Sequence, residues 1–431
     1  MKEKKESFFG RINEGLHDMC YIWAQEMKTT VLDEGVLIFF ILVPLAYPLI
    51  YSWAYNNEVT RDVPVAVVDL SHSQNSRQFI RLYNASPDVN VAYHCNNLEE
   101  AKELIGKQVV RGAVYIPHDF DERLNRMEQA HVSVYCDMSF MMAYKAIYQT
   151  ATAVSGEMNK KIQIALSGNP TDREDEISTQ PLAFEEVAIF NPTSGYGSFI
   201  LPPVLILIIQ QTLLLAIGLS AGTARENNRY RDLVPVSRHY NGIFRIVLGK
   251  SLCYFMISAL SAAWLTMIVP RLFHFTALLQ WKPLLALMFP YLLACIFFGM
   301  MISCMVRYRE NILLLVIFMS LPLLFMSGVS WPQSAIPGSW RAVACIFPST
   351  FGVRGFVRLS SMGASLSDIK LEYQMLWLQS LVYFFITCAV YRYQIIQARR
   401  HAMGEIQKMK NRTTMAKVKK VVVPAQPDES E

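Results

Sequence analysis

Six apolar stretches of this 431-residue chain lack every ionisable residue type: none contains Asp, Glu, Lys, Arg or His. Carriers that couple transport to protons or sodium usually place such groups at membrane depth, despite their cost. The absence therefore argues against an ion-coupled carrier, although it does not exclude a passive channel. The stretches are residues 36–53, 199–219, 252–269, 284–306, 312–329 and 376–391.

A nucleotide-binding loop is also lacking. Gly249-Lys250-Ser251 looks like the end of a phosphate-binding loop, but Phe244 stands where that motif requires its first glycine. The tripeptide also opens an apolar stretch, whereas the motif follows a strand. We interpret Lys250 as a snorkelling residue at the membrane interface. We expect no cofactor, and any ATP-driven motor would have to lie on another chain.

Metal and redox motifs are equally scarce. The eight cysteines form no Cys-x-x-Cys pair, and no His/Cys cluster has metal-ligand spacing. Cys95 and Cys136 fall in a polar region, and the sequence leaves open whether they form a disulfide. No Ser/His/Asp set or pair of catalytic carboxylates stands out, so we expect a non-catalytic protein. Four scattered histidines are interpreted as surface or packing residues: His72, His94, His118 and His131.

The chain is rich in apolar residues. Hydrophobic residues make up 52% of it, and charged residues only 17%. Each apolar stretch approaches the roughly 20 residues that a helix needs to cross a bilayer. The predicted fold class is an α-helical membrane protein with six transmembrane helices, an N-terminal interfacial helix and an extracytoplasmic α/β domain.

Lys and Arg set the expected orientation. They concentrate before the first stretch, between the second and third, between the fourth and fifth, and in the C-terminal tail. By the positive-inside rule both termini are cytoplasmic. The small positive net charge belongs to this topology and predicts no nucleic-acid partner. The first stretch begins too late for a cleavable signal peptide and is expected to remain as an anchor.

The segments follow from these assignments. Residues 1–35 form a cytoplasmic amphipathic helix, with apolar residues recurring at steps of three and four. Residues 36–55 form the first transmembrane helix, with Pro44 and Pro48 tolerated where neighbouring groups satisfy the freed carbonyls. The apolar positions of the N-terminal helix are Ile12, Leu16, Met19, Trp23, Met27 and Val31.

The remaining chain divides into three segments. Residues 56–196 form the extracytoplasmic α/β domain. Residues 197–395 form a five-helix transmembrane block, and residues 396–431 a partly disordered cytoplasmic tail. Within the α/β domain we predict strands at 63–69, 89–93, 109–116 and 132–137, with helices between them and a long helix at 138–166.

Two groups of residues resemble the ABC-2 type transporter permease family. The first group follows the second apolar stretch and consists of Arg225-Glu226, Leu233, Pro235-Val236-Ser237 and Gly249-Lys250. Where the family has Gly-Thr, this chain has Asn228-Arg229-Tyr230. The second group follows the fifth apolar stretch and consists of Ser327-Gly328-Val329, Pro332, Ile336-Pro337, Trp340, Phe347-Pro348-Ser349-Thr350 and Arg354-Gly355. The large domain after the first stretch resembles the bacterial multidrug-type export permeases.

The resemblance implies a permease subunit of an ATP-binding-cassette exporter in the bacterial inner membrane. Its implied partners are an ABC ATPase subunit, a second permease chain (itself or a paralogue) and, for this subgroup, a periplasmic adaptor. It implies a coupling loop at 223–245 and an outer re-entrant segment at 330–372. The implied ATPase-coupling residues are Arg225, Glu226, Arg229, Arg231, Asp232, Pro235 and Ser237. The residues of the re-entrant segment and its approach are Ser327, Gly328, Pro332, Pro337 and Pro348.

Two questions stay open at this stage. Gln210 and Gln211 lie at membrane depth in the second stretch, where they either line a substrate path or hydrogen-bond between helices. The alternative to transport is a membrane receptor or scaffold whose external domain binds a ligand or periplasmic partner. A signalling domain would then be expected on the cytoplasmic side, and the tail is too short for one.

Overall fold

The chain is organised as two units, and the second is inserted into the first. The membrane unit combines residues 1–56 with 194–431, and the α/β unit comprises residues 57–193. The computed structural model describes residues 8–56, 58–168, 171–182, 187, 189–192, 195–227, 233, 242–275, 277–305 and 308–422.

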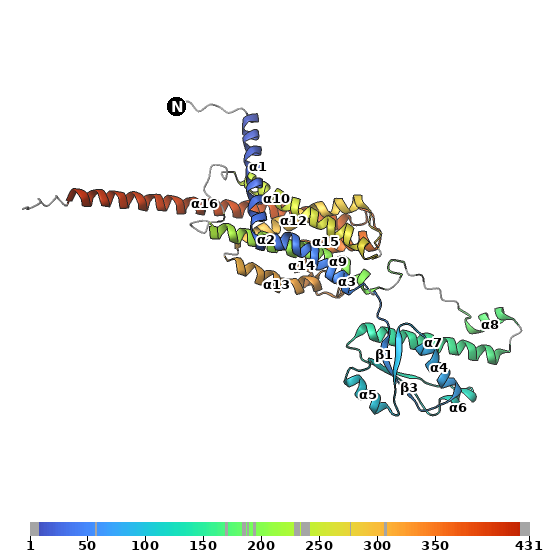
Figure 1. Ribbon diagram of the computed structural model, residues 1–431. Helices are drawn as coiled ribbons and strands as arrows, with labels where there is room; N and C mark the ends of the chain where they lie inside the picture. The colour runs from blue at the N-terminus through green and yellow to red at the C-terminus, as the bar shows by residue number, and fades with distance from the viewer. Residues whose placement is uncertain are drawn as a thin grey trace, which may run out of the picture. The chain divides into compact units, whose positions relative to one another are not determined.

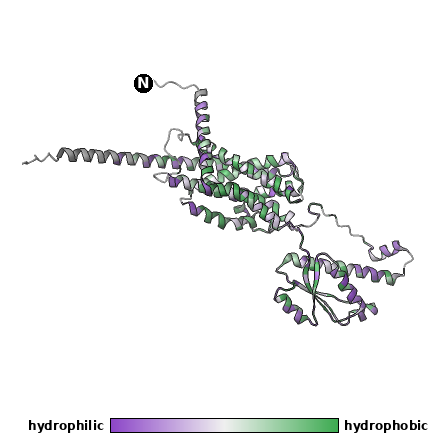
Figure 2. Ribbon diagram, in the orientation of Figure 1, coloured by the Kyte–Doolittle hydropathy of each residue, from purple (hydrophilic) through white to green (hydrophobic). Residues whose placement is uncertain are grey.

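Within these residues, six helical segments are long and apolar enough to cross a membrane. Each contains most or all of one predicted stretch, so the six-helix prediction is confirmed at this level; Figure 2 shows their hydrophobic character. The first, Glu34–Ala54, is built from α2 (Glu34–Leu37), η1 (Ile38–Leu42) and α3 (Val43–Ala54). The third joins α10 (Ile243–Ala263), η3 (Trp264–Ile268) and α11 (Val269–Leu272). The others are α9 (Tyr196–Asn227), α12 (Trp281–Met305), α13 (Arg309–Met326) and α16 (Lys370–Val422), whose apolar part ends at His401.

Two π-helical segments precede prolines in these spans. Segment η1 ends just before Pro44, and η3 ends just before Pro270. Proline has no N–H, and its ring crowds the carbonyl four residues earlier, so the helix widens locally. For Pro44 that carbonyl belongs to Phe40, and it accepts a hydrogen bond from Ser261 Oγ at 3.1 Å. A neighbouring helix thus satisfies the freed carbonyl, as the sequence predicted.

Helices α9 and α12 form the centre of the membrane unit. Both are mostly buried and share a continuous apolar core with α15 (Pro348–Ser361), whereas α13 is mostly exposed. Glycine permits the closest approach of α9 to α13, because a methyl group on Gly218 would collide with Ile312. Figure 1 shows these helices side by side, with α1 (Phe8–Leu32) crossing the direction of the bundle.

A sharp helical bend follows the fifth span. Helix α14 (Gly338–Ala344) and helix α15 meet at 89°, the geometry of a broken span or a re-entrant loop. Phe347 and Pro348 occupy the bend, and Pro348 begins α15, where its fixed φ and missing N–H carry no penalty. The bend lies within the expected segment 330–372, and its assignment as an outer re-entrant loop stays a prediction.

The α/β unit contains a four-stranded sheet with the order β2-β1-β3-β4. Strands β1 (Val63–Asp69), β2 (Val89–His94) and β3 (Gly112–Ile116) are parallel, and β4 (Ser133–Cys136) runs antiparallel to β3. The predicted strands are confirmed, although β3 begins three residues later than expected. The helices are α4 (Gln74–Asn84), α5 (Leu98–Gly106), α6 (Phe120–Asn125), α7 (Met141–Ser167) and α8 (Asp172–Thr179).

Alternation along β1 assigns these helices to the two faces of the sheet. Val63, Val65 and Val67 share an apolar cluster with residues of α4, α6 and α7. Ala66 and Val68 point the other way and share a cluster with residues of α5. The sheet is therefore covered on both faces, as expected for parallel strands joined by helices.

The two cysteines that the sequence left open are free thiols. Cys95 follows β2 and Cys136 ends β4, the two opposite edges of the sheet. Strands lie about 4.8 Å apart, so these edges are much farther apart than the roughly 7 Å limit between the Cα atoms of a disulfide. Burial raises the pKa of the Cys136 thiol to about 11, which keeps it protonated and unreactive.

The α9–α13 contact yields a stability prediction. Gly218→Ala should overpack the contact with Ile312 at a cost of about 1–3 kcal/mol. We expect a lower midpoint of thermal unfolding in detergent, and in the double variant with Ile312→Ala a loss smaller than the sum of the single losses. Gly156→Ala is the control, because nothing lies within 4 Å of the added methyl group. Equal midpoints for Gly218→Ala and wild type would contradict the packing.

Candidate functional site

Helix α1 carries charge on its buried face. Asp18, Ile22, Glu26 and Thr30 recur every four residues, and all are at most 7% exposed. The predicted helix is confirmed, and its predicted apolar stripe is buried in part: Trp23 and Met27 pack against the core of the bundle, whereas Leu16 and Val31 are more than half exposed. The charged face beside this stripe was not predicted, although the four-residue spacing of its members was a signal.

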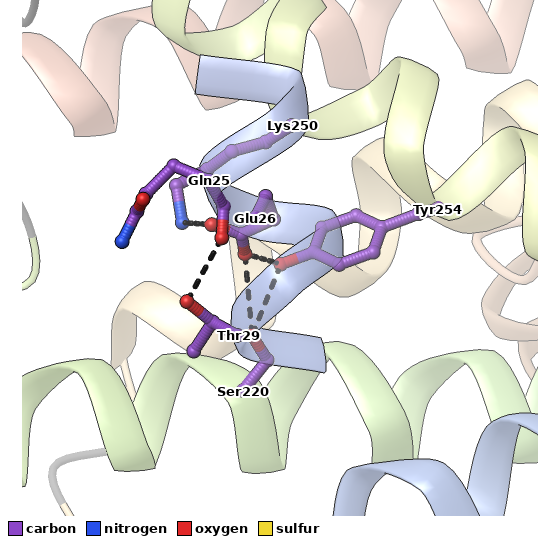
Figure 3. A network of polar contacts seen from close by, with 6 residues as sticks. All are labelled: Gln25, Glu26, Thr29, Ser220, Lys250 and Tyr254. Atoms are coloured by element: carbon purple, nitrogen blue, oxygen red, sulfur yellow. Dashed lines mark hydrogen bonds and ion pairs between the residues drawn. The ribbon is translucent and has the colours of Figure 1, made fainter. Parts of the chain in front are cut away.

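Glu26 is the centre of a buried polar network (Figure 3). Lys250 Nζ of α10 lies 2.7 Å from Glu26 Oε2. Glu26 Oε1 accepts hydrogen bonds from Tyr254 OH of α10 and from Ser220 Oγ of α9, the latter at 3.2 Å. One carboxylate thus joins the N-terminal helix to the second and third spans. The prediction that Lys250 snorkels to the interface is wrong, because its side chain is only 5% exposed and ion-paired.

Two further ion pairs connect the N-terminal region to the bundle. Arg245, in the first turn of α10, lies 2.5 Å from Asp18. Asp33, between α1 and α2, lies 2.8 Å from Arg309 at the start of α13 and accepts a hydrogen bond from Thr223 of α9. Asp18, Glu26 and Asp33 thus each meet a basic residue near the start of a span.

The Asp33 carboxylate is also held by backbone donors. Its Oδ1 accepts hydrogen bonds from the N–H groups of Gly35 and Val36, which caps α2. Burial, the largest single influence, raises the pKa of Asp33. The bonds from Thr223 and Val36 and the charge of Arg309 outweigh it, so the pKa is lowered and the carboxylate stays ionised.

The structure describes two of the seven expected ATPase-coupling residues. Arg225 is buried and donates a hydrogen bond to the carbonyl of Cys304 in α12 at 2.9 Å, whereas Glu226 is exposed. Helix α9 continues to Asn227 and α10 begins at Ile243, so the connection is shorter than the expected 223–245. The other five residues lie outside the described part: Arg229, Arg231, Asp232, Pro235 and Ser237.

The expected re-entrant residues fall around the bend after α13. Ser327 is buried and donates to the Leu324 carbonyl, and Gly328 has φ +87°, a conformation that glycine adopts without strain. Pro332 precedes the short helix η4 (Gln333–Ala335), and Pro337 precedes α14. Together with Pro348 at the start of α15, these residues set the backbone conformation of the segment and so shape the bend.

Gln210 and Gln211 differ in their surroundings. Gln210 is fully buried, and its Oε1 accepts a hydrogen bond from Ser349 N at 2.7 Å, which ties α9 to the start of α15. This contact is what a role in helix association predicts. Both polar atoms of the Gln211 amide are buried without a hydrogen-bond partner among the described residues. Gln211 therefore lacks the contact between helices that Gln210 makes, and its role stays a prediction.

Within the described residues, no group of three or more His, Cys, Asp and Glu side chains is arranged to hold a metal ion.

Comparison with known protein families identifies the family to which the chain belongs. The family model for the ABC-2 family transporter protein matches residues 35–389, which is most of the chain. The protein therefore belongs to the ABC-2 transporter family and is a multi-pass membrane protein. A search among curated proteins gave no significant match.

The buried ion pair yields the second prediction. Lys250→Met leaves Glu26 buried without its cation, and breaking a buried pair in this way costs about 3–5 kcal/mol. We expect a marked fall in the thermal unfolding midpoint of the purified protein. Replacing both residues, Glu26→Met with Lys250→Met, should recover much of the loss because no uncompensated charge remains.

Lys28→Met is the matched control, because Lys28 is an exposed residue of the same helix α1 as Glu26. It should leave the midpoint nearly unchanged. A double variant at Glu26 and Lys250 that is as unstable as Lys250→Met alone would show that the two charges do not compensate each other.

Proposed function

We propose that this protein is the membrane-spanning permease subunit of an ATP-binding-cassette exporter, driven by a separate ATPase chain. The observation that carries the proposal is the family match over residues 35–389, which covers all six candidate spans except the C-terminal part of the last. We further propose that it lies in a bacterial inner membrane with both termini cytoplasmic, as the distribution of Lys and Arg predicts.

The polar contacts around α1 suggest how such a permease would respond to its motor. The proposed docking surface is the connection between α9 and α10, with exposed Glu226 at its start. Ser220 and Lys250, on the two helices that flank this connection, both contact Glu26. A displacement imposed on the connection would therefore move α9, α10 and α1 together. Because α9 is largely buried against α12 and α15, the movement would reach the centre of the bundle.

In this proposal, the substrate passes between two permease chains, near the second and fifth spans. Helix α13 is mostly exposed and presents large apolar residues that need either lipid or a second chain: Leu314, Ile317, Phe318, Leu321 and Phe325. Gln211 of α9 is proposed to line this path; its amide is buried in this structure and has no hydrogen-bond partner among the described residues. A periplasmic adaptor for the α/β unit completes the proposed assembly.

Coupling is tested by reversing charge in the connection. The double variant Glu226→Lys with Arg231→Glu should weaken co-purification of the ATPase or its stimulated turnover. Charged contacts at an interface are worth about 2–5 kcal/mol when one buried partner is lost. The matched control reverses Arg123 on α6 and Arg126 directly after it, both in the α/β unit, and should leave ATPase association unchanged. Full ATPase binding and full transport by the first variant would remove the coupling role from this connection.

Orientation is tested with a reporter that is active only outside the cytoplasm. Fusions after Asn169 or Pro337 should be active, because both positions belong to segments assigned to the outer side. Fusions after Asn227 or Met409 should be inactive. Activity at Asn227 would contradict both the six-span topology and the placement of the coupling connection.

A further inference from the structure

The α/β unit contains a crevice that neither the transport proposal nor the family match explains. The loop after β1 leads to α4 on one face of the sheet, and the loop after the adjacent strand β2 leads to α5 on the other. In open α/β sheets, ligands bind in a crevice outside the carboxyl ends of the strands. A cavity of about 820 Å³ lies at this place.

The cavity is lined from both loops and from the first turns of α4. Its polar lining consists mainly of Asp69, His72, Arg77, Arg81, His94 and Asn96. Its volume lies within the roughly 300–1,000 Å³ typical of small-molecule sites. The site therefore has room for an organic ligand as well as for an inorganic ion.

The free charge in this lining is positive. Arg77 and Arg81 lie one turn apart on α4 and are exposed, as are His72 and His94. Arg77 donates to the carbonyl of His72, a contact that leaves its charge unneutralised. Among the described residues, the Arg81 guanidinium makes no ion pair or hydrogen bond. Two arginines, neither in an ion pair with another described residue, thus border the cavity.

The nearby carboxylates are already occupied by internal donors. Asp69 Oδ1 accepts hydrogen bonds from the N–H groups of Ser71 and His72, and Oδ2 accepts one from Ser76 Oγ at 2.8 Å. Glu100, at the start of α5, accepts one from the N–H of Asn96. Asp69 therefore shapes the loop beneath the arginines. Its negative charge offsets one of theirs, and the net charge of these three residues is positive.

We propose that this crevice binds a small anionic ligand through a carboxylate or phosphate group, with Arg77 and Arg81 as its charged anchors. A guanidinium presents paired N–H donors that match the oxygens of either group. Asn96 and the two histidines offer further polar contacts, and the apolar part of the lining accepts the body of the ligand. The site lies wholly within the α/β unit, so it is independent of ATPase coupling.

The test is hydrogen exchange measured by mass spectrometry on the full-length protein in an uncharged detergent. Inorganic phosphate and succinate are the two probes, each compared with chloride at equal ionic strength. Binding should slow exchange of the backbone amides at 69–81 and 94–97. Protection by phosphate alone or by succinate alone identifies which anionic group the site takes.

The variant Arg77→Gln with Arg81→Gln should require at least tenfold more probe for the same protection, because each charge-assisted hydrogen bond contributes about that factor. Both residues are exposed, and unchanged exchange of β1 will show that the sheet remains folded. The matched control, Arg123→Gln with Arg126→Gln, removes the same charge at α6, where Arg123 pairs with Asp119 and Arg126 with Glu122. It should bind as wild type does.

Two results would overturn the proposal. One is the absence of protection by either probe up to its solubility limit. The other is equal protection in wild type and in the Arg77→Gln, Arg81→Gln variant. Because no ATPase is present in this experiment, neither result bears on the proposed permease function.

Discussion

Water is excluded around Glu26 and Lys250, so each of these charges depends on the other. A charge transferred from water into a low-dielectric interior loses solvation worth several kcal/mol even after relaxation, and only a close partner with further hydrogen bonds offsets that loss. Here the partner lies at 2.7 Å, and Tyr254 and Ser220 complete the carboxylate's bonding. Such a pair contributes little net stability, but it fixes which faces of α1, α9 and α10 meet.

The same constraint explains why α1 lies where it does. Asp18 and Glu26 of α1, and Asp33 directly after it, each meet a basic residue near the start of a span, namely Arg245, Lys250 and Arg309. An amphipathic helix that only rested on the membrane would expose these acids to water. With the acids turned inward, α1 is fixed to the third and fifth spans, and its apolar residues Leu16 and Val31 remain exposed for lipid.

The α/β unit is held together by apolar contacts of its own. Its central strands β1 and β3 are buried on both faces, and its two apolar clusters lie within residues 63–158. The unit therefore has a core of its own, and its insertion between α3 and α9 requires nothing of the spans except a connection at each end. The crevice at the ends of β1 and β2 is a consequence of covering the sheet with helices on both faces.

The sequence by itself determined the elements whose signal is local. Long runs without charge specify the spans, because a helix in lipid must satisfy its own backbone and cannot expose ionised groups. Short runs rich in valine and other strand-forming residues specify the strands of the α/β unit. The family, too, could be recognised from short motifs in order.

Only the tertiary structure decided which side chains meet. No residue near Lys250 in the sequence indicates a contact with Glu26, which lies more than two hundred positions earlier. The role of Lys250 was therefore misjudged. Arg225 illustrates the same limit: within a charged segment it looks like a docking residue, yet it is buried against the carbonyl of Cys304. The separation of Cys95 from Cys136, and the gathering of Arg77, Arg81 and His94 around one cavity, depended equally on strand order. Local patterns fix backbone conformation, whereas partners distant in sequence are chosen by packing and by the cost of leaving a buried charge alone.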